Sequence, residues 1–242
     1  MKILVTGHEG FIGSHVSEHL RSLGYTVEGL SFPDDIGNFK GNFKGGDYGL
    51  IIHLAAFANI RGSLDNPDVF WENNVEKSKP LFEWCRQTNT RILYASSSAV
   101  HEWWINPYAI TKKVNEVQAP PNSVGMRFFN VWAEKDSRSD MLYRMLQENT
   151  AKYLTRHRRD WIHVHDVARA ICFLMPDKYR GVIDVGTGKT TSVLELAEKM
   201  GKGHLPIKED TPGERDETCA DTTELTKLGW HPTINILDFA SP

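Results

Sequence analysis

The first thirteen residues of the chain constrain its fold more than any other segment. An apolar run at residues 3–5 predicts a buried strand, which breaks into a turn with glycines three apart at Gly7, Gly10 and Gly13. Apolar residues then recur at helical spacing through residues 12–20, so the segment is predicted to fold as strand, glycine turn and helix. The free amides at such a helix start are suited to a pyrophosphate. The alternative is a glycine-rich turn with nothing bound.

Each glycine would serve this turn in a different way. Gly7 would allow the tight turn, Gly10 would let the backbone approach a phosphate closely, and Gly13 would let the helix pack closely on the strand. The pattern therefore predicts a dinucleotide site at the end of the first strand.

Length and composition exclude several other classes of protein. The 242 residues can bury a sizeable core, and a net charge of −3 gives no indication of a nucleic-acid or membrane partner. No apolar stretch approaches the roughly 20 residues that cross a bilayer. We expect no secretion signal, because the chain runs directly into a strand. The three scattered cysteines predict reduced thiols and a cytoplasmic location, not a disulfide frame or a metal site.

Beyond the first strand and helix, strands and helices alternate along the chain. Further strands are predicted at residues 25–32, 50–56, 91–95, 124–129 and 182–185. Helices are predicted at residues 68–87, 107–117, 141–148, 165–175 and 192–200. This alternation predicts an α/β fold with a Rossmann-like, doubly wound parallel sheet. Residues 33–46, rich in Gly, Asn and Asp, predict a loop.

Several motifs follow one another in an order that is similar to a known family. They are Thr-Gly-x-x-Gly-Phe-Ile-Gly at residues 6–13, His-Leu-Ala-Ala at 53–56, Asn-Asn-Val at 73–75, Tyr-Ala-Ser-Ser-Ser at 94–98, Tyr-Ala-Ile-Thr-Lys at 108–112, Arg-Phe-Phe-Asn-Val at 127–131 and Arg-Asp-Trp-Ile-His-Val-His-Asp at 159–166. The chain resembles the extended short-chain dehydrogenase/reductase family, in its NAD-dependent nucleoside-diphosphate-sugar epimerase and dehydratase branch. It is identified as a shortened member.

The resemblance implies a division of labour along the chain. Residues 1–130 are expected to form an NAD(P)-binding Rossmann domain, to which residues 160–190 return, and residues 131–242 a smaller substrate-binding part. The residues that the resemblance assigns to the cofactor are Gly7, Gly10, Phe11, Ile12, Gly13, Ser31, Leu54, Ala55, Ala56, Asn74, Tyr108 and Lys112.

The end of the second predicted strand favours NAD over NADP. The acidic residue with which the family holds the adenosine ribose is replaced by Ser31, and no arginine follows it to take a 2′-phosphate. Glu9 in the glycine turn would repel such a phosphate. Asp34 or Asp35 could substitute for the missing carboxylate. We therefore expect NAD, with NADP as the second choice.

Two residues four apart on a predicted helix suggest proton transfer. Tyr108 and Lys112 share a helix face, and a fixed ammonium favours the phenolate, lowering a tyrosine pKa from ~10 toward the working range. By resemblance, Tyr108 removes a proton from a sugar hydroxyl as hydride leaves the same carbon, and Lys112 also holds the nicotinamide ribose. The alternative is an ordinary tyrosine and lysine on a helix surface.

Three serines precede this helix. By resemblance, Ser97 occupies the position of the family's catalytic serine, where it would hydrogen-bond the reacting oxygen. Ser96 and Ser98 are the alternatives, one residue away on either side. A polar strand end at the carboxyl edge of the sheet is the interpretation without catalysis.

The later motifs imply contacts to a nucleotide-sugar. Asn130 and Arg159 lie where the family contacts the diphosphate, a task that suits an arginine. The alternative for Arg159 is an exposed member of the basic run at residues 156–159. A further phosphate-binding arginine of the family is replaced by Thr211, for which Arg215 could compensate.

A pair of histidines in the same region does not predict a metal site. His163 and His165 have the spacing of metal ligands, but no third ligand is apparent in the sequence. We therefore predict no metal and interpret the two residues as strand-edge histidines.

The resemblance implies an NAD-dependent nucleotide-sugar epimerase, acting at C4 of a nucleoside-diphosphate hexose through transient oxidation. A dehydratase is disfavoured, because the family's Asp-Glu after the catalytic hydroxyl is Ser98-Ala99 here. An NAD(P)H-dependent keto-sugar reductase and a non-catalytic protein that binds a dinucleotide or nucleotide-sugar stay open. A homodimer also stays open, because the helix that helps form the family's dimer interface is cut short near Pro120.

Overall fold

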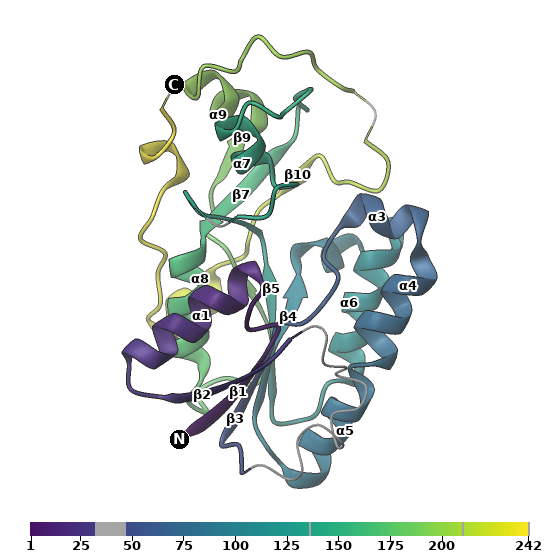
Figure 1. Cartoon of the computed structure of the whole chain (residues 1–242), viewed down its shortest axis with the longest axis vertical. Coiled ribbons are helices and arrows are strands. Elements are labelled where there is room, and N and C mark those ends of the chain that lie inside the picture. The colour runs from purple at the N-terminus through teal and green to yellow at the C-terminus, as the bar shows by residue number, and fades with distance from the viewer. Residues whose placement is uncertain (32–46, 136, 210, 242) are drawn as a thin grey trace. The chain divides into compact units, whose positions relative to one another are not determined.

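The computed structural model describes residues 1–31, 47–135, 137–209 and 211–241 (Figure 1). The loop predicted over residues 33–46, with Asp34 and Asp35, lies outside these residues. Within the described ranges, no helix is both long enough and apolar enough to cross a membrane. The chain divides into two compact units, which are described separately: Met1–Arg127 with Ala168–Ile183 (unit 1), and Phe128–Val167 with Asp184–Pro242 (unit 2).

Six strands form one sheet in the order β2-β1-β3-β4-β5-β8. They are β1 (Lys2–Thr6), β2 (Thr26–Leu30), β3 (Leu50–His53), β4 (Ile92–Ser97), β5 (Ser123–Phe128) and β8 (Gly181–Val185). β1 pairs in parallel with both β2 and β3, and β3 pairs in parallel with β4. The prediction of a Rossmann-like, doubly wound sheet is confirmed.

Helices cover both faces of the sheet in unit 1. Figure 1 shows α1 on one face and α5 and α6 on the other. The bounds are α1 (Phe11–Ser22), α3 (Ile60–Asp65), α4 (Pro67–Trp71), α5 (Lys79–Thr88), α6 (Pro107–Gln118) and α8 (Val164–Leu174). Under α5, the apolar side chains of Leu81, Phe82 and Cys85 pack against strand residues such as Ile51 and Ile92.

The prediction of one helix over residues 68–87 is wrong. The segment folds as α4, a turn of π-helix, η2 (Glu72–Glu76), and then α5. Pro80 falls in the first turn of α5, where its missing N–H is tolerated but where a continuous helix would lose a hydrogen bond. β3 is also shorter than predicted, because it ends at His53.

Unit 2 contains the predicted helices at residues 141–148 and 192–200, together with four strands and a helix that the sequence pattern does not predict. Its strands are β6 (Asn130–Trp132), β7 (Arg158–His163), β9 (Thr190–Ser192) and β10 (Glu217–Thr218), with β7 between β10 and β6 and β9 antiparallel to β7. Its helices are α7 (Leu142–Gln147), α9 (Val193–Lys199) and α10 (Thr223–Leu228). Strands of two or three residues are too short to show an alternation of apolar and polar residues.

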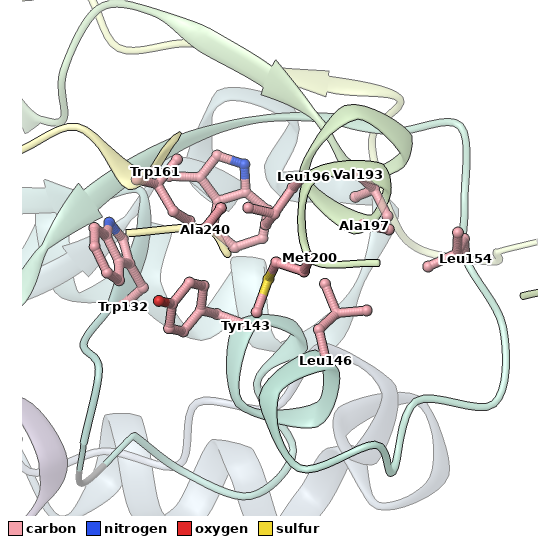
Figure 2. Close-up of a cluster of buried hydrophobic side chains, with 11 residues drawn as sticks. Trp132, Tyr143, Leu146, Leu154, Trp161, Val193, Leu196, Ala197, Met200 and Ala240 are labelled. Carbon is pink, nitrogen blue, oxygen red and sulfur yellow. The ribbon is translucent and has the colours of Figure 1, made fainter. Parts of the chain in front are cut away.

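Aromatic and aliphatic side chains fill the core of unit 2 (Figure 2). The rings of Trp132 and Tyr143 are tilted against each other with centroids 4.8 Å apart. Trp161, Leu196 and Met200 belong to the same cluster, so strand β7 and helix α9 are joined by apolar contact. Trp132 and Trp161 therefore lie in this core.

Candidate active site

The carboxyl ends of β1 and β3 meet at the point where the strand order reverses. Gly7 follows β1 with a φ of +71°, and a Cβ there would lie 2.8 Å from the backbone nitrogen of Ala55. Glycine is therefore required both for the turn and for the close approach of the two chains. The contact brings Leu54 and Ala55 beside the glycine turn, and Ala56 follows them as a partly exposed residue. Open α/β sheets bind ligands at this position.

The start of α1 has the features of an anion site. Gly10 is the N-cap of α1, and among the described residues no side chain caps this helix start. The amides of Phe11 and Ile12 lie in this uncapped first turn, where helix N–H groups have no partner within the helix. A Cβ on Gly13 would lie 1.9 Å from the carbonyl oxygen of Gly7, so the helix packs directly on the turn. This cradle fits the pyrophosphate of a dinucleotide.

Asn74 lies within the π-helical turn and is fully buried. Its Oδ1 accepts a hydrogen bond from the Phe57 N–H at 2.8 Å, and its Nδ2 donates to the Phe57 carbonyl at 3.0 Å and to Thr111 Oγ1 at 3.1 Å. The amide therefore ties the chain after β3 to α6. Direct contact of Asn74 with a cofactor stays a prediction. The hydrogen bonds of Asn74 show that it positions the backbone of Phe57.

The three serines after β4 face different surroundings. Ser96 donates to Glu116 Oε1 at 2.7 Å, and successive strand side chains point to opposite faces, so Ser97 faces away from this pair. Ser97 Oγ accepts a hydrogen bond from the Ala99 N–H at 3.2 Å, which starts the 3-10 helix η3 (Ser98–Ile105). Ser98 is buried within η3. The geometry therefore favours Ser97 over both neighbours.

Tyr108 and Lys112 lie on one face of α6, as their spacing predicts. The Lys112 Nζ is 5.9 Å from the centroid of the Tyr108 ring and donates to the carbonyl oxygen of Ala95 at 3.0 Å. Both side chains are buried, which excludes the alternative of an ordinary pair on a helix surface. Because Ala95 belongs to β4, the ammonium sits at the same strand end as Ser97.

Ser63 positions this part of α6 and was not predicted. Its buried hydroxyl accepts a hydrogen bond from the Tyr108 N–H at 3.1 Å and donates to the Ile60 carbonyl at 2.6 Å. The Tyr108 ring also meets the edge of Phe70, with centroids 6.5 Å apart. No local pattern in the sequence marks Ser63, because its partner is 45 residues away.

Burial sets the charge state of two groups near the strand ends. It lowers the pKa of His53 to about 3, with the charge of Lys112 as a further cause, so the imidazole is neutral. His53 Nδ1 lies 2.7 Å from Thr6 Oγ1 and its Nε2 lies 3.1 Å from Ser78 Oγ, which joins β1, β3 and α5. Burial also lowers the pKa of Lys112 to about 8. At neutral pH the ammonium of Lys112 is therefore present, 5.9 Å from the centroid of the Tyr108 ring.

Replacing Lys112 by methionine should stabilise the protein at pH 7 by up to about 3 kcal/mol in free energy of unfolding. The pKa of Lys112 falls from 10.5 to about 8 on folding, so the folded state disfavours the charged form. This penalty is complete below pH 8 and disappears as the pH rises through 10.5. Urea denaturation at pH 7 and pH 9.5 should show the gain shrinking at the higher pH.

Lys113→Met is the matched control for this change. Its side chain is 38 % exposed and lies 3.8 Å from Glu116, so its removal should alter stability by less than about 1 kcal/mol. A Lys112→Met protein that is less stable than wild type at pH 7 would contradict the argument from burial.

Arg159 lies in β7 and is buried, so the alternative of an exposed basic run does not apply to it. Its guanidinium is 2.6 Å from His157 Nδ1, donates to the Asp216 carbonyl at 3.1 Å, and is 3.5 Å from Glu214 Oε2. Burial lowers the pKa of Arg159, and the positive charge of Arg215 is a smaller cause in the same direction.

Arg159 and His157, with Thr211 beside them, form a basic cluster of unit 2. His157 Nε2 lies 2.9 Å from Thr211 Oγ1. Asn130 starts β6, which pairs in parallel with β7, and is in register with Trp161. The sequence did not single out His157, although it is two residues before Arg159 and lies next to it in space.

The histidines with metal-like spacing are part of a different contact. His163 Nε2 lies 2.9 Å from Glu134 Oε2, and the N–H of His165 donates to His163 Nδ1 at 3.3 Å. Among the residues that the structure describes, no three His, Cys, Asp or Glu side chains are grouped as a metal site.

Comparison with known proteins identifies the family. Residues 3–186 match the NAD dependent epimerase/dehydratase family, and the chain belongs to it. A UDP-glucuronate 4-epimerase of Thermodesulfobacterium geofontis is 26% identical over 297 residues, which cover 96% of this chain and 92% of that protein. Family membership confirms the predicted resemblance and NAD as the cofactor, and the protein is an enzyme of the epimerase/dehydratase type.

Two solved structures show the same fold. An NAD-dependent NDP-hexosamine 5,6-dehydratase of tunicamycin biosynthesis superposes with a TM-score of 0.86 and 23% identity, covering 98% of this chain and 94% of that one. The UDP-glucose 4-epimerase of Thermus thermophilus in complex with NAD has a TM-score of 0.79 and 22% identity, covering 98% and 96%. At this identity the likeness speaks for the fold alone.

Proposed function

We propose that this enzyme is a nucleotide-sugar epimerase that inverts C4 of a nucleoside-diphosphate hexose. The observation that carries the proposal is the buried pair of Tyr108 and Lys112, 5.9 Å apart from ring centroid to Nζ, with Ser97 at the end of the neighbouring strand. A phenol next to a buried ammonium suits proton transfer to and from a hydroxyl. Sequence relatives named as 4-epimerases of UDP-sugars support the same reaction.

The residues of unit 1 would divide the chemistry among them. Bound NAD would supply a hydride acceptor that later returns the hydride to the opposite face of the same carbon, so none is consumed. Tyr108 would take the proton of the C4 hydroxyl in the first half of the cycle and return it in the second. Lys112 would stabilise the phenolate, and Ser97 would donate a hydrogen bond to the reacting oxygen.

The basic cluster of unit 2 would bind the diphosphate of the substrate. Arg159 and Arg215 supply positive charge, and Asn130 supplies an amide donor. The contacts of Arg159 to His157 and Glu214 hold its guanidinium in one orientation, which reduces the entropy lost on binding. The proposal includes the diphosphate contacts of Arg159, Arg215 and Asn130. It also includes the roles of Ser97 and Tyr108.

A dehydratase needs a further acid and base for the elimination of water. The residues after Ser97 are Ser98 and Ala99, both buried and without a carboxyl group. This favours epimerisation over dehydration at the proposed site. A keto-sugar reductase would use the same tyrosine and lysine, but it would consume an external nicotinamide donor.

Product analysis tests the proposal. The purified protein is incubated with UDP-glucose, UDP-N-acetylglucosamine or UDP-glucuronate without added cofactor, and the products are separated by chromatography that resolves C4 epimers. We expect a C4 epimer of unchanged mass. The same equilibrium mixture should form whether the reaction starts from the substrate or from its C4 epimer. A product lighter by one water, or turnover only with added NADPH, would contradict the epimerase.

A further inference from the structure

An uncharged residue follows β2, at the edge of the sheet that would bind the adenosine ribose of a dinucleotide. In Rossmann folds an acidic residue after the second strand accepts a hydrogen bond from the ribose 2′-hydroxyl. Here β2 ends at Leu30 and the next residue is Ser31, which carries no charge. A serine can hydrogen-bond a ribose, but it cannot reject a 2′-phosphate by charge.

Hydrogen bonds tie Ser31 to the glycine turn. The N–H of Glu9 donates to Ser31 Oγ at 3.2 Å, and the same oxygen lies 3.0 Å from His8 Nδ1. The His8 ring occupies space left by Gly29 on β2, where a Cβ would lie 2.2 Å from the ring. The backbone of Glu9 is therefore held beside the end of β2, next to Ser31, which stands directly after the strand where Rossmann folds have the acidic residue.

We infer that Glu9 replaces that missing carboxylate and selects NAD over NADP. Its side chain is 67% exposed, and Oε1 lies 3.9 Å from His8 Nε2, beyond hydrogen-bond distance. The carboxylate can thus accept hydrogen bonds from ribose hydroxyls. A 2′-phosphate would add about −1.5 to −2 charges beside it. This inference rests on the NAD dependence within the proposed function, and adds the residue that decides between the two cofactors.

If charge repulsion by Glu9 selects NAD, the preference for NAD over NADP should depend on the salt concentration. Repulsion between exposed charges is screened by salt, with a Debye length of about 10 Å at 0.1 M ionic strength. The preference of the wild-type protein for NAD should therefore weaken as salt is added. Without the Glu9 carboxylate, the preference should depend much less on salt.

A competition experiment tests the inference without measuring activity. Wild-type and Glu9→Gln proteins are equilibrated with equal excesses of NAD and NADP at low and high salt, freed of unbound nucleotide and denatured. Mass spectrometry then gives the ratio of the two dinucleotides released. We expect Glu9→Gln to lower the ratio of NAD to NADP by about tenfold or more, because a charged hydrogen bond is lost and the repulsion is removed.

Glu28→Gln is the matched control. It removes a carboxylate from β2 that points to the opposite face from Gly29 and pairs with Lys2 at 2.5 Å, so the ratio should stay at the wild-type value. If Glu9→Gln keeps the wild-type ratio, or if Glu28→Gln changes it equally, Glu9 does not select the cofactor and the proposed function is untouched. If the wild-type protein retains neither dinucleotide, the inference and the proposed function both fail.

Discussion

Replacing Tyr108 by phenylalanine should lower the turnover number by about a thousandfold and leave NAD bound. The change removes only the hydroxyl that we propose as acid and base, and such groups typically contribute 10²–10⁴ in rate. The ring would keep its edge contact with Phe70 at 6.5 Å, so α6 should stay in place. The turnover number for C4 epimerisation and the amount of NAD released on denaturation are the two measurements.

Tyr94→Phe is the control for this variant. Tyr94 is a buried tyrosine on β4, the strand that also carries Ser97. Its hydroxyl lies over Gly125 of β5, and loss of this hydroxyl should leave the turnover number within a few-fold of wild type. Turnover retained by Tyr108→Phe would refute the assigned acid and base. Loss of bound NAD together with turnover would show that the hydroxyl holds the cofactor instead.

Replacing Arg91 by leucine should lower the free energy of unfolding by about 3–5 kcal/mol. Arg91 is 8% exposed, and its guanidinium donates hydrogen bonds to backbone carbonyl oxygens at and after the end of α8. It donates at 2.9–3.1 Å to the carbonyl oxygens of Leu174, Met175, Pro176 and Tyr179. Leu174 and Met175, at the end of α8, are buried, and the last carbonyls of a helix have no partner within it, so a leucine would remove the guanidinium that binds them.

Chemical denaturation of Arg91→Leu measures this effect, and Arg86→Leu is its control. Arg86 makes one hydrogen bond, to the Gln118 carbonyl at 2.7 Å, from an exposed position. Its replacement should cost less than about 1 kcal/mol. Equal losses of stability in the two variants would show that the four carbonyl contacts of Arg91 add nothing beyond an ordinary exposed bond.

Elements with a strong local pattern could be predicted to within a few residues. The apolar run at residues 3–5 and the glycine turn after it are such elements, and β1 and α1 begin and end close to their predicted limits. The pattern is local because a buried strand and an amphipathic helix each require a periodic apolar face. The predicted helix over residues 68–87 failed since apolar periodicity continues across the π-helical turn.

Polar elements could not be predicted, because their partners are distant in the sequence. β7 contains Arg159 and Asp160, which no strand pattern favours. Asp160 is fully buried, and its carboxylate accepts hydrogen bonds from the N–H groups of Thr187, Gly188 and Ala220 at 2.7–3.1 Å. Burying a carboxylate costs free energy unless hydrogen-bond donors surround it, and here the tertiary fold supplies these donors.

The sequence by itself determined the α/β class, the glycine turn and the pair of Tyr108 and Lys112. The glycine turn and the pair depend on spacings of three or four residues, and the class depends on the order of strands and helices that such local patterns predict. Only the tertiary structure decided that Ser97 rather than Ser96 faces away from Glu116, that Ser63 supports Tyr108, and that Glu9 meets Ser31. These contacts join residues 20 to 45 positions apart, and strand pairing and helix packing bring them together. A hydrogen bond acts over about 3 Å, so its partners are known only once the chain is folded.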